Sequence, residues 1–155
     1  MTLLFKKLNL RDEKIIHVLR APASFEQELA ALEASSGIDI KRAAKGRVSF
    51  ALAFAITLAE LDQVSAALVA AAEGDATLWI AYPKASSKKY RCEFTRDIKW
   101  PVLGAADYEP VRQVAIDEDW SALRFRKVTY IQTMRRVANG AISRAGRAKA
   151  QSQHD

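Results

Sequence analysis

The chain has 155 residues, half of them hydrophobic and 27% charged, which is the composition of one globular domain. Its longest apolar run, residues 48–59, is shorter than the roughly 20 residues that a transmembrane helix needs, and no N-terminal run has signal-peptide length. The one cysteine, Cys92, excludes an internal disulfide framework. We therefore expect a cytoplasmic protein with no membrane partner.

The net charge of +6 is unevenly distributed along the chain. Residues 1–130 contain 19 Lys and Arg against 17 Asp and Glu, whereas residues 131–155 contain five Lys and Arg against one acid. The basic excess therefore belongs mainly to the C-terminal end rather than to the body. This distribution favours only weak, non-specific binding of nucleic acid.

The first half of the chain predicts strands that alternate with helices. Residues 14–20 form a short apolar run that is typical of a buried strand. Ser24 and Gln27 then match a capping box that opens a helix, and Gly37 is expected to end it. A weaker strand follows at residues 38–43.

The next unit repeats this pattern. Residues 48–56 predict another buried strand, and Thr57 with Glu60 matches a second capping box. The helix that it opens is expected to end near Gly74, because glycine suits a left-handed C-cap. Residues 78–82 predict the next strand.

The second half of the chain changes character after the basic stretch 85–95. A helix is predicted at residues 96–106, with Pro101 near its first turn. Residues 111–117 and 120–128 then read as an antiparallel hairpin. The whole order predicts a three-layer, Rossmann-like α/β fold: a mostly parallel sheet with an antiparallel C-terminal hairpin at its edge.

One domain is predicted at residues 1–130, because no repeat and no linker divides them. Residues 129–138 have the apolar spacing of a short helix. Beyond Gly140 no apolar stripe continues. Residues 131–155 are therefore predicted as a short helix followed by a basic, disordered tail.

Two resemblances accompany this pattern. Residues 75–80 and the hairpin 111–128 resemble the corresponding strands of a truncated class I methyltransferase, or Rossmann-like, sheet. Most of residues 10–127 more closely resemble a bacterial family of small domains of unknown function, in which Asn often stands at the position of Arg20 here. The resemblance implies a fold without an activity, and its motifs are Leu19-Arg20-Ala21-Pro22 and residues 78–84, 96–100, 114–117 and 120–126.

The turn after the first strand disfavours a nucleotide cofactor. Adenosylmethionine and dinucleotide sites need glycines there, so that backbone amides can approach the ligand. Residues 20–24 contain no glycine, and Pro22 removes one amide donor. Asp39, the nearest counterpart of the acid that holds ribose hydroxyls, lies inside a predicted strand. We therefore expect no cofactor and disfavour methyltransferase activity.

Metal and nucleophilic chemistry are also disfavoured. Neither His17, predicted to be buried with a satisfied hydrogen bond, nor His154 has further ligands at metal spacing. Cations at residues 88–96 could lower the pKa of Cys92. No histidine is near this cysteine in the sequence, so an unreactive thiol is the preferred interpretation. We predict no catalytic residue.

A ligand edge is nevertheless predicted after the strand 78–82, because open α/β sheets bind ligands at the carboxyl ends of their strands. Lys84, Ser86 and Ser87 could hold a phosphate or carboxylate there, helped by the N-terminus of a helix that starts at Arg96. A solvated basic loop is the structural alternative.

Three further side chains are included in this site. Asp97 is expected in the first turn of that helix. Trp120 and Arg124 should share one face of the last strand, because side chains alternate with a period of two. An ion pair joining Arg124 to Asp97 would be structural by default and functional only if it lines a cleft.

Three functions remain open. The first is a non-catalytic domain that binds a protein partner or a small anionic ligand. The second is an enzyme, of degenerate methyltransferase type, that uses Lys84, Asp97 and Arg124 at the same edge. The third is weak nucleic-acid binding through residues 41–47, the stretch 84–99 and the tail. Convergence of the named side chains in a pocket would favour a ligand or an enzyme.

Overall fold

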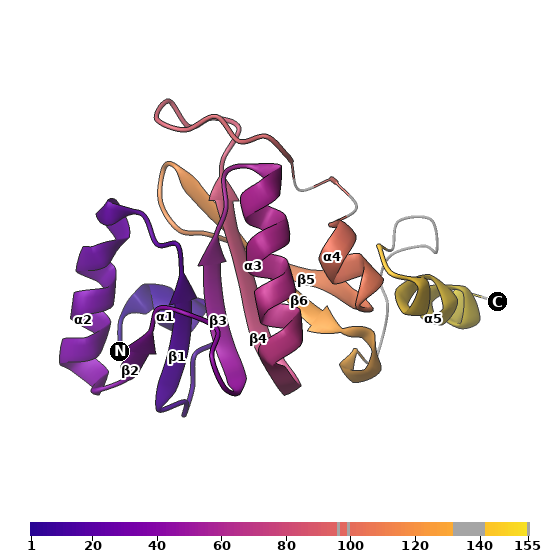
Figure 1. The fold of residues 1–155 in the computed structure, drawn as a ribbon, viewed down its shortest axis with the longest axis horizontal. Coiled ribbons are helices and arrows are strands. Elements are labelled where there is room, and N and C mark those ends of the chain that lie inside the picture. Colours follow the sequence, from indigo (N-terminus) through magenta and orange to yellow (C-terminus); the bar gives the residue numbers. More distant parts are fainter. Residues whose placement is uncertain (96, 99, 132–141, 155) are drawn as a thin grey trace.

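The computed structural model describes residues 1–95, 97–98, 100–131 and 142–154, with the side chains of residues 150–154 left aside. It is built on a six-stranded sheet of order β2-β1-β3-β4-β6-β5 (Figure 1). The first four strands are parallel, and β6 and β5 are antiparallel to their neighbours. This is the predicted mostly parallel sheet with an antiparallel edge. The strands are β1 (Ile15–Leu19), β2 (Asp39–Lys41), β3 (Val48–Phe54), β4 (Ala72–Pro83), β5 (Tyr108–Ala115) and β6 (Trp120–Lys127).

Helices cover both faces of the sheet and give the predicted three layers. Helix α3 (Leu58–Ala71) lies in front of the sheet with α4 (Pro101–Ala105), while α1 (Leu3–Lys7) lies behind it (Figure 1). Helix α2 (Glu26–Ser36) shares the hydrophobic core of α1. We call the two sides the α3–α4 face and the α1–α2 face; each strand contributes alternate side chains to the two cores.

Several local signals act as predicted. The Thr57 hydroxyl accepts a hydrogen bond from the Glu60 amide at 3.1 Å, and the Glu60 carboxylate accepts one from the Thr57 amide, which completes the capping box of α3. Gly37 ends α2 with a φ of 69°. Pro101 lies in the first turn of α4. These boundaries depend on residues close in sequence, which is why the sequence predicts them.

Two predicted caps are wrong. Helix α2 starts at Glu26 without a side-chain cap, because residues 23–25 form a 3₁₀ turn after Pro22 that encloses Ser24. Helix α3 ends at Ala71 and β4 starts at once. Gly74, with a φ of 60°, instead lies within β4, where the pairing with β3 is irregular.

The third predicted helix is much shorter than expected. It spans Pro101–Ala105 instead of residues 96–106. Trp100 precedes it with a φ of 49°, outside the helical region, because proline disfavours a helical conformation of the residue before it. Helix α1, which Thr2 caps, was not predicted at all.

The described part of the C-terminal end contains a helix that the sequence did not predict. Residues 144–154 form helix α5, and the predicted helix 129–138 lies largely outside the described residues, apart from a 3₁₀ turn at Val128–Tyr130. The fully buried Glu109 carboxylate accepts hydrogen bonds from the amides of Ile142, at 3.0 Å, and Ser143, at 2.5 Å.

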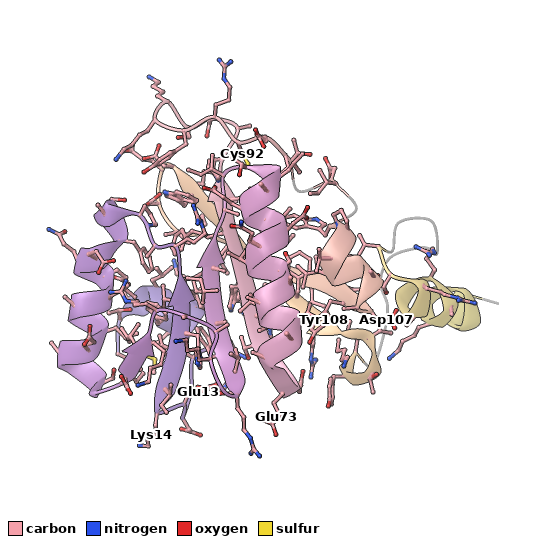
Figure 2. All side chains as sticks on the ribbon, viewed as in Figure 1. Glu13, Lys14, Glu73, Cys92, Asp107 and Tyr108 are labelled. Carbon is pink, nitrogen blue, oxygen red and sulfur yellow. The ribbon has the colours of Figure 1, made fainter. Side chains whose placement is uncertain are left out.

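Asp107 adds a second contact to this end of the chain. Its carboxylate accepts a hydrogen bond from the Ala145 amide at 3.2 Å, and Figure 2 shows it close to α5. The carboxylates of Asp107 and Glu109 are more than 30 residues away from their partners in sequence, so no local pattern reveals these two contacts; locally, the Ser143 hydroxyl accepts a hydrogen bond from the Gly146 amide at 2.7 Å. No helix in the described ranges is both long and apolar enough to cross a membrane.

Candidate functional site

The sheet order reverses between β1 and β3, because the chain moves from β1 to β2 on one side and then returns to β3 on the other. Open α/β sheets bind ligands in the crevice at the carboxyl ends of such strands. Here that crevice has a volume of about 270 Å³. We call it the switch-point crevice; it is lined by Arg20, Pro22, Ala23, Phe54, Ala55, Ile56, Glu60, Tyr90 and Trp120.

The chain's own carboxylate closes the switch-point crevice. Glu60 accepts hydrogen bonds from the amides of Ile56, at 2.8 Å, and Thr57, at 3.1 Å, and from the Arg20 guanidinium at 2.5 Å. The Ile56 amide is the main cause that lowers the pKa of Glu60; the Thr57 amide and the Arg20 charge act in the same direction, against burial. Glu60 is therefore a carboxylate at neutral pH.

The turn after β1 has a left-handed backbone conformation at a residue that is not glycine. Arg20 has a φ of 59°, in the left-handed region that favours glycine. This conformation costs a non-glycine residue about 1–2 kcal/mol, and the ion pair with Glu60 helps to offset it. The sequence showed that this turn has an arginine and no glycine, but not that the arginine reaches a partner 40 residues away.

A second carboxylate caps the start of α3. Glu93 accepts a hydrogen bond from the Leu58 amide at 2.8 Å, and its own amide donates to the Ile56 carbonyl at 3.0 Å. The backbone amides that could hold a phosphate at this helix start are thus engaged by Glu60 and Glu93. These bonds also anchor the loop that follows β4.

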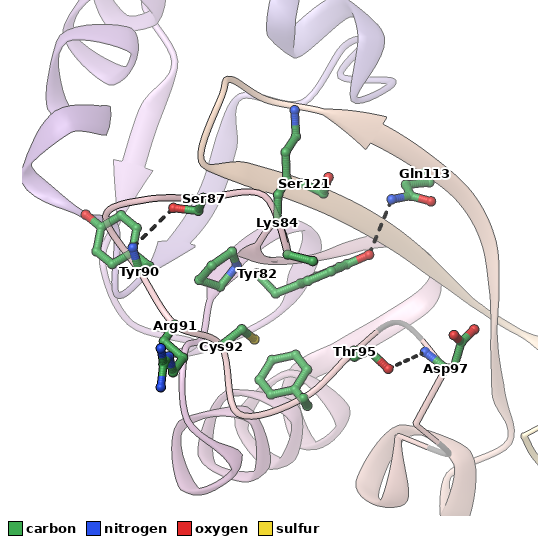
Figure 3. Close-up of a pocket in the computed structure, with 13 residues that line it drawn as sticks. Tyr82, Lys84, Ser87, Tyr90, Arg91, Cys92, Thr95, Asp97, Gln113 and Ser121 are labelled. Carbon is green, nitrogen blue, oxygen red and sulfur yellow. Dashed lines mark hydrogen bonds between the residues drawn. The ribbon is translucent and has the colours of Figure 1, made fainter.

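That loop encloses a larger pocket at the carboxyl end of β4, with a volume of about 550 Å³ (Figure 3). We call it the β4 pocket. The rings of Tyr82 and Phe94 form an apolar wall, with centroids 6.0 Å apart. Gln113 donates a hydrogen bond of 3.4 Å to the Tyr82 hydroxyl, and Ser121 lies beside them. The remaining lining residues are Pro83, Lys84, Ala85, Ser87, Tyr90, Arg91, Cys92, Thr95 and Asp97.

The predicted loop residues contribute unequally to this pocket. Lys84 is half-buried, lines the pocket and extends beside Ser121 (Figure 3). Ser86 is exposed and does not line it. The Ser87 hydroxyl donates to the Asp119 carboxylate at 2.7 Å and accepts bonds from two loop amides, so it organises the loop. Of the three, Lys84 keeps its charged group available to a ligand.

The predicted contribution of a helix N-terminus is wrong. Helix α4 begins at Pro101, so Asp97 precedes its first turn. Asp97 is exposed and lines the β4 pocket, and its amide donates to the Thr95 hydroxyl at 3.3 Å. Arg96 lies outside the described residues. The charge at this pocket therefore comes from the side chains of Lys84, Arg91 and Asp97 and not from a helix N-terminus.

Trp120 and Arg124 do share one face, as predicted, but it is the α1–α2 face, opposite the β4 pocket. Trp120 packs on Phe54 with ring centroids 5.1 Å apart. Ser121 and Leu123 point to the α3–α4 side, where Asp97 lies. An ion pair between Arg124 and Asp97 is therefore not formed, because strand alternation places the two groups on opposite sides of the sheet.

Cys92 and His17 also differ from expectation. Cys92 lies near the start of α3 (Figure 2), and burial raises the pKa of its thiol instead of nearby cations lowering it. This supports the interpretation as an unreactive thiol. His17 is buried as predicted, but its Nδ1 has no hydrogen-bond partner. No group of three His, Cys, Asp or Glu side chains suited to a metal occurs among the described residues.

The basic turn at residues 41–47 is largely neutralised. Arg42 makes two hydrogen bonds to the Glu26 carboxylate, at 2.7 and 2.8 Å. Arg47 pairs with Glu73 at 3.0 Å, and Lys41 pairs with its neighbour Asp39 at 3.0 Å. A surface whose cations already have partners offers little charge to a nucleic acid.

The similarity of this chain to known proteins is low. No known protein family and no curated protein matches this chain. Among similar solved structures, magnesium protoporphyrin IX methyltransferase (ChlM) from Synechocystis is 13% identical, with 80% of this chain and 74% of that chain covered and a TM-score of 0.47. A protein of the NADB-Rossmann superfamily from Streptococcus agalactiae is 9% identical, with 82% and 68% covered and a TM-score of 0.41.

TehB from Haemophilus influenzae is 10% identical to this chain, with a TM-score of 0.41. The match covers 72% of this chain but only 49% of TehB, so the chain spans about half the length of that protein. The neighbours are methyltransferase-like Rossmann folds, and the likeness concerns the fold alone.

Proposed function

We propose that this chain is a non-catalytic, Rossmann-like binding domain that takes a small anionic ligand in the β4 pocket. The observation that carries this proposal is the contrast in volume and lining at one sheet edge: a 550 Å³ pocket with a cationic rim beside a 270 Å³ crevice closed by Glu60. A volume of about 550 Å³ lies within the usual range of small-molecule sites.

The lining indicates the chemistry of the ligand. Lys84 and Arg91 bring positive charge to the rim, and Asp97 brings one negative charge. The ring of Tyr82 and its neighbour Phe94 provide an apolar wall. A small organic molecule with a carboxylate or phosphate and a flat apolar part fits this combination.

Two observations favour binding over catalysis. The enzyme hypothesis needs Lys84, Asp97 and Arg124 together, but Arg124 is on the opposite face of the sheet. The raised pKa of Cys92 keeps this thiol protonated at neutral pH, which makes it a weak nucleophile. Both observations support a site that holds a ligand without transforming it.

Other sequence-based expectations remain part of this proposal. We infer one domain at residues 1–130, membership of the bacterial family of small domains of unknown function, and a cytoplasmic location. Partners other than a small anion, including a protein partner or weakly bound nucleic acid, are the alternatives that the experiments below address.

A thermal-shift screen tests the proposal. The panel contains nucleotides, adenosylmethionine, and small carboxylates and phosphates. Adenosylmethionine should bind poorly, because the amides at the switch point are engaged by Glu60 and Glu93. For the strongest hit, Lys84→Ala should weaken binding by about 1–3 kcal/mol, as expected for one charge-assisted hydrogen bond. Ser86→Ala, outside the pocket lining, is the matched control.

The opposite outcomes are equally clear. A micromolar dissociation constant for adenosylmethionine in calorimetry would contradict the closed switch point. If Lys84→Ala leaves the affinity of every hit unchanged but lowers the melting temperature, this lysine is a structural residue, and the β4 pocket loses its main anion-binding group.

A further inference from the structure

A second basic region lies on the other side of the sheet, on the β5–β6 hairpin. Arg112 of β5 stands directly opposite Arg124 of β6 in the antiparallel register. Arg126 is two positions further along β6 and therefore on the same face. Arg112 is exposed, and the other two are half-buried. Like charges directly opposite each other destabilise an antiparallel pair, so this arrangement needs a compensating group.

A fourth arginine is brought to the same place from the N-terminal end. The indole of Trp79, which faces Arg124 across the β4–β6 register, donates a 2.8 Å hydrogen bond to the Leu8 carbonyl. This bond holds the segment after α1 against the sheet. Arg11 follows in that segment, and its guanidinium donates to the Asn9 side chain at 3.0 Å. We call Arg11, Arg112, Arg124 and Arg126 the arginine patch.

Among the described residues, one member of the patch, Arg126, forms an ion pair with a carboxylate. Asp75 accepts two hydrogen bonds from Arg126, at 2.9 and 2.5 Å. Glu109 stands opposite Arg126 in the register, but its carboxylate is fully buried and accepts hydrogen bonds from the amides of Ile142 and Ser143 instead. Within the described ranges, Arg112 and Arg124 have no ion pair, and the buried Nε of Arg124 has no hydrogen-bond acceptor.

The electrostatics of Arg124 agree with this geometry. Burial is the main cause that lowers its pKa, and the charges of Arg126, Arg112 and Arg11 act in the same direction. Asp75 opposes them. The C-terminal part of the sequence, residues 120–154, contains eight Lys and Arg and no Asp or Glu, so it supplies no carboxylate to the patch.

We propose that the arginine patch is a binding site for a phosphate-bearing anion, separate from the β4 pocket. A guanidinium group can donate two hydrogen bonds to two oxygens of one phosphate. An anion between Arg112 and Arg124 would therefore supply the hydrogen-bond acceptors and the negative charge that these two arginines lack among the described residues. The basic turn at residues 41–47 differs from the arginine patch. Its residues Lys41, Arg42 and Arg47 each form an ion pair with a carboxylate of the chain. Small polyphosphates and the backbone of a nucleic acid share this chemistry.

Titration calorimetry at low ionic strength, with inorganic tripolyphosphate in one arm and a short single-stranded oligonucleotide in the other, tests the site. Arg112→Gln/Arg124→Gln should weaken tripolyphosphate binding about tenfold or more, the effect of losing charge-assisted hydrogen bonds. Lys45→Gln/Lys88→Gln removes the same charge elsewhere and should change the affinity much less. Affinity should fall as salt is added.

Thermal melts without phosphate separate this site from a structural role. The double arginine variant should be at least as stable as the wild type, because it removes a like-charge pair. Tripolyphosphate should then raise the melting temperature of the wild type more than that of the variant. Tighter binding of the oligonucleotide than of tripolyphosphate, with the same loss in the variant, would identify nucleic acid as the source of the phosphate.

Three results overturn the proposal: no binding in either arm, equal losses in the arginine and lysine variants, or a lower melting temperature of the arginine variant in the absence of phosphate.

Discussion

The switch-point crevice and the β4 pocket lie at the carboxyl edge of one sheet, and the chain treats them in opposite ways. At the switch point, two carboxylates engage the amides at the start of α3, and Arg20 adds an ion pair. At β4, the loop folds over a pocket twice as large and leaves lysine and arginine side chains on its rim. On our proposal, the usual ligand position of an open α/β sheet is used for stability in this chain, and the neighbouring β4 pocket takes the ligand.

Removing the contacts of Glu60 at the switch-point crevice should have the largest effect on stability. Glu60→Ala removes the acceptor of two amides and the partner of Arg20, so the free energy of unfolding should fall by about 2–3 kcal/mol. Urea denaturation measures this loss. A decrease below about 0.5 kcal/mol would mean that solvent replaces the carboxylate and that the crevice is not closed by it.

The pH dependence of the same variant sharpens the comparison. Because the pKa of Glu60 is lowered in the folded state, its contribution is fully present above the ordinary value of 4.5 and is lost as pH falls through the lowered pKa. The difference in unfolding free energy between wild type and Glu60→Ala should therefore be constant near neutral pH and shrink in acid. A difference that grows in acid would contradict the assignment.

Ser87→Ala should have the next largest effect, on the pocket side. The variant loses the bond to Asp119 and the acceptor of two amides, so stability should fall by about 1–2 kcal/mol. Ser86→Ala, at an exposed neighbouring position, should be neutral. If the two variants have the same free energy of unfolding, Ser87 does not organise the loop, and its hydroxyl is again a candidate for binding the ligand.

Glu93→Ala connects the two regions and should have a smaller effect. Glu93 is exposed, so the loss of its bond to Leu58 should cost about 1 kcal/mol. Because this bond anchors the loop over the β4 pocket, hydrogen exchange of residues 84–95 should accelerate. Unchanged exchange in the loop would show that the two regions are independent.

Much of this fold could be predicted from the sequence, because its signals are local. Strands are marked by short apolar runs, and the capping box of Thr57 and the C-cap Gly37 depend on residues a few positions apart. The length of helix α4 was overestimated, because the predicted range 96–106 did not allow for the restriction that Pro101 imposes on Trp100. The existence of α5 could not be predicted, since its anchor Glu109 is distant in sequence.

The site was harder to predict than the fold. The alternation of residues 120–126 correctly places Trp120 and Arg124 on one face, but nothing in that pattern says which face meets Asp97. That choice is made by the register between β4 and β6. The Arg20–Glu60 pair was missed for a similar reason: a capping-box glutamate gives no sign that it also binds an arginine from the turn after β1.

The most direct test of the central claim locates the bound ligand by NMR. Backbone amide shifts are recorded while the strongest hit of the anion screen is titrated into the labelled protein. The account predicts the largest shifts at Lys84, Thr95 and Ser121, with small changes at Ile56 and Thr57. Largest shifts at Ile56 and Thr57 would contradict it, because they would place the ligand in the crevice that Glu60 is said to close.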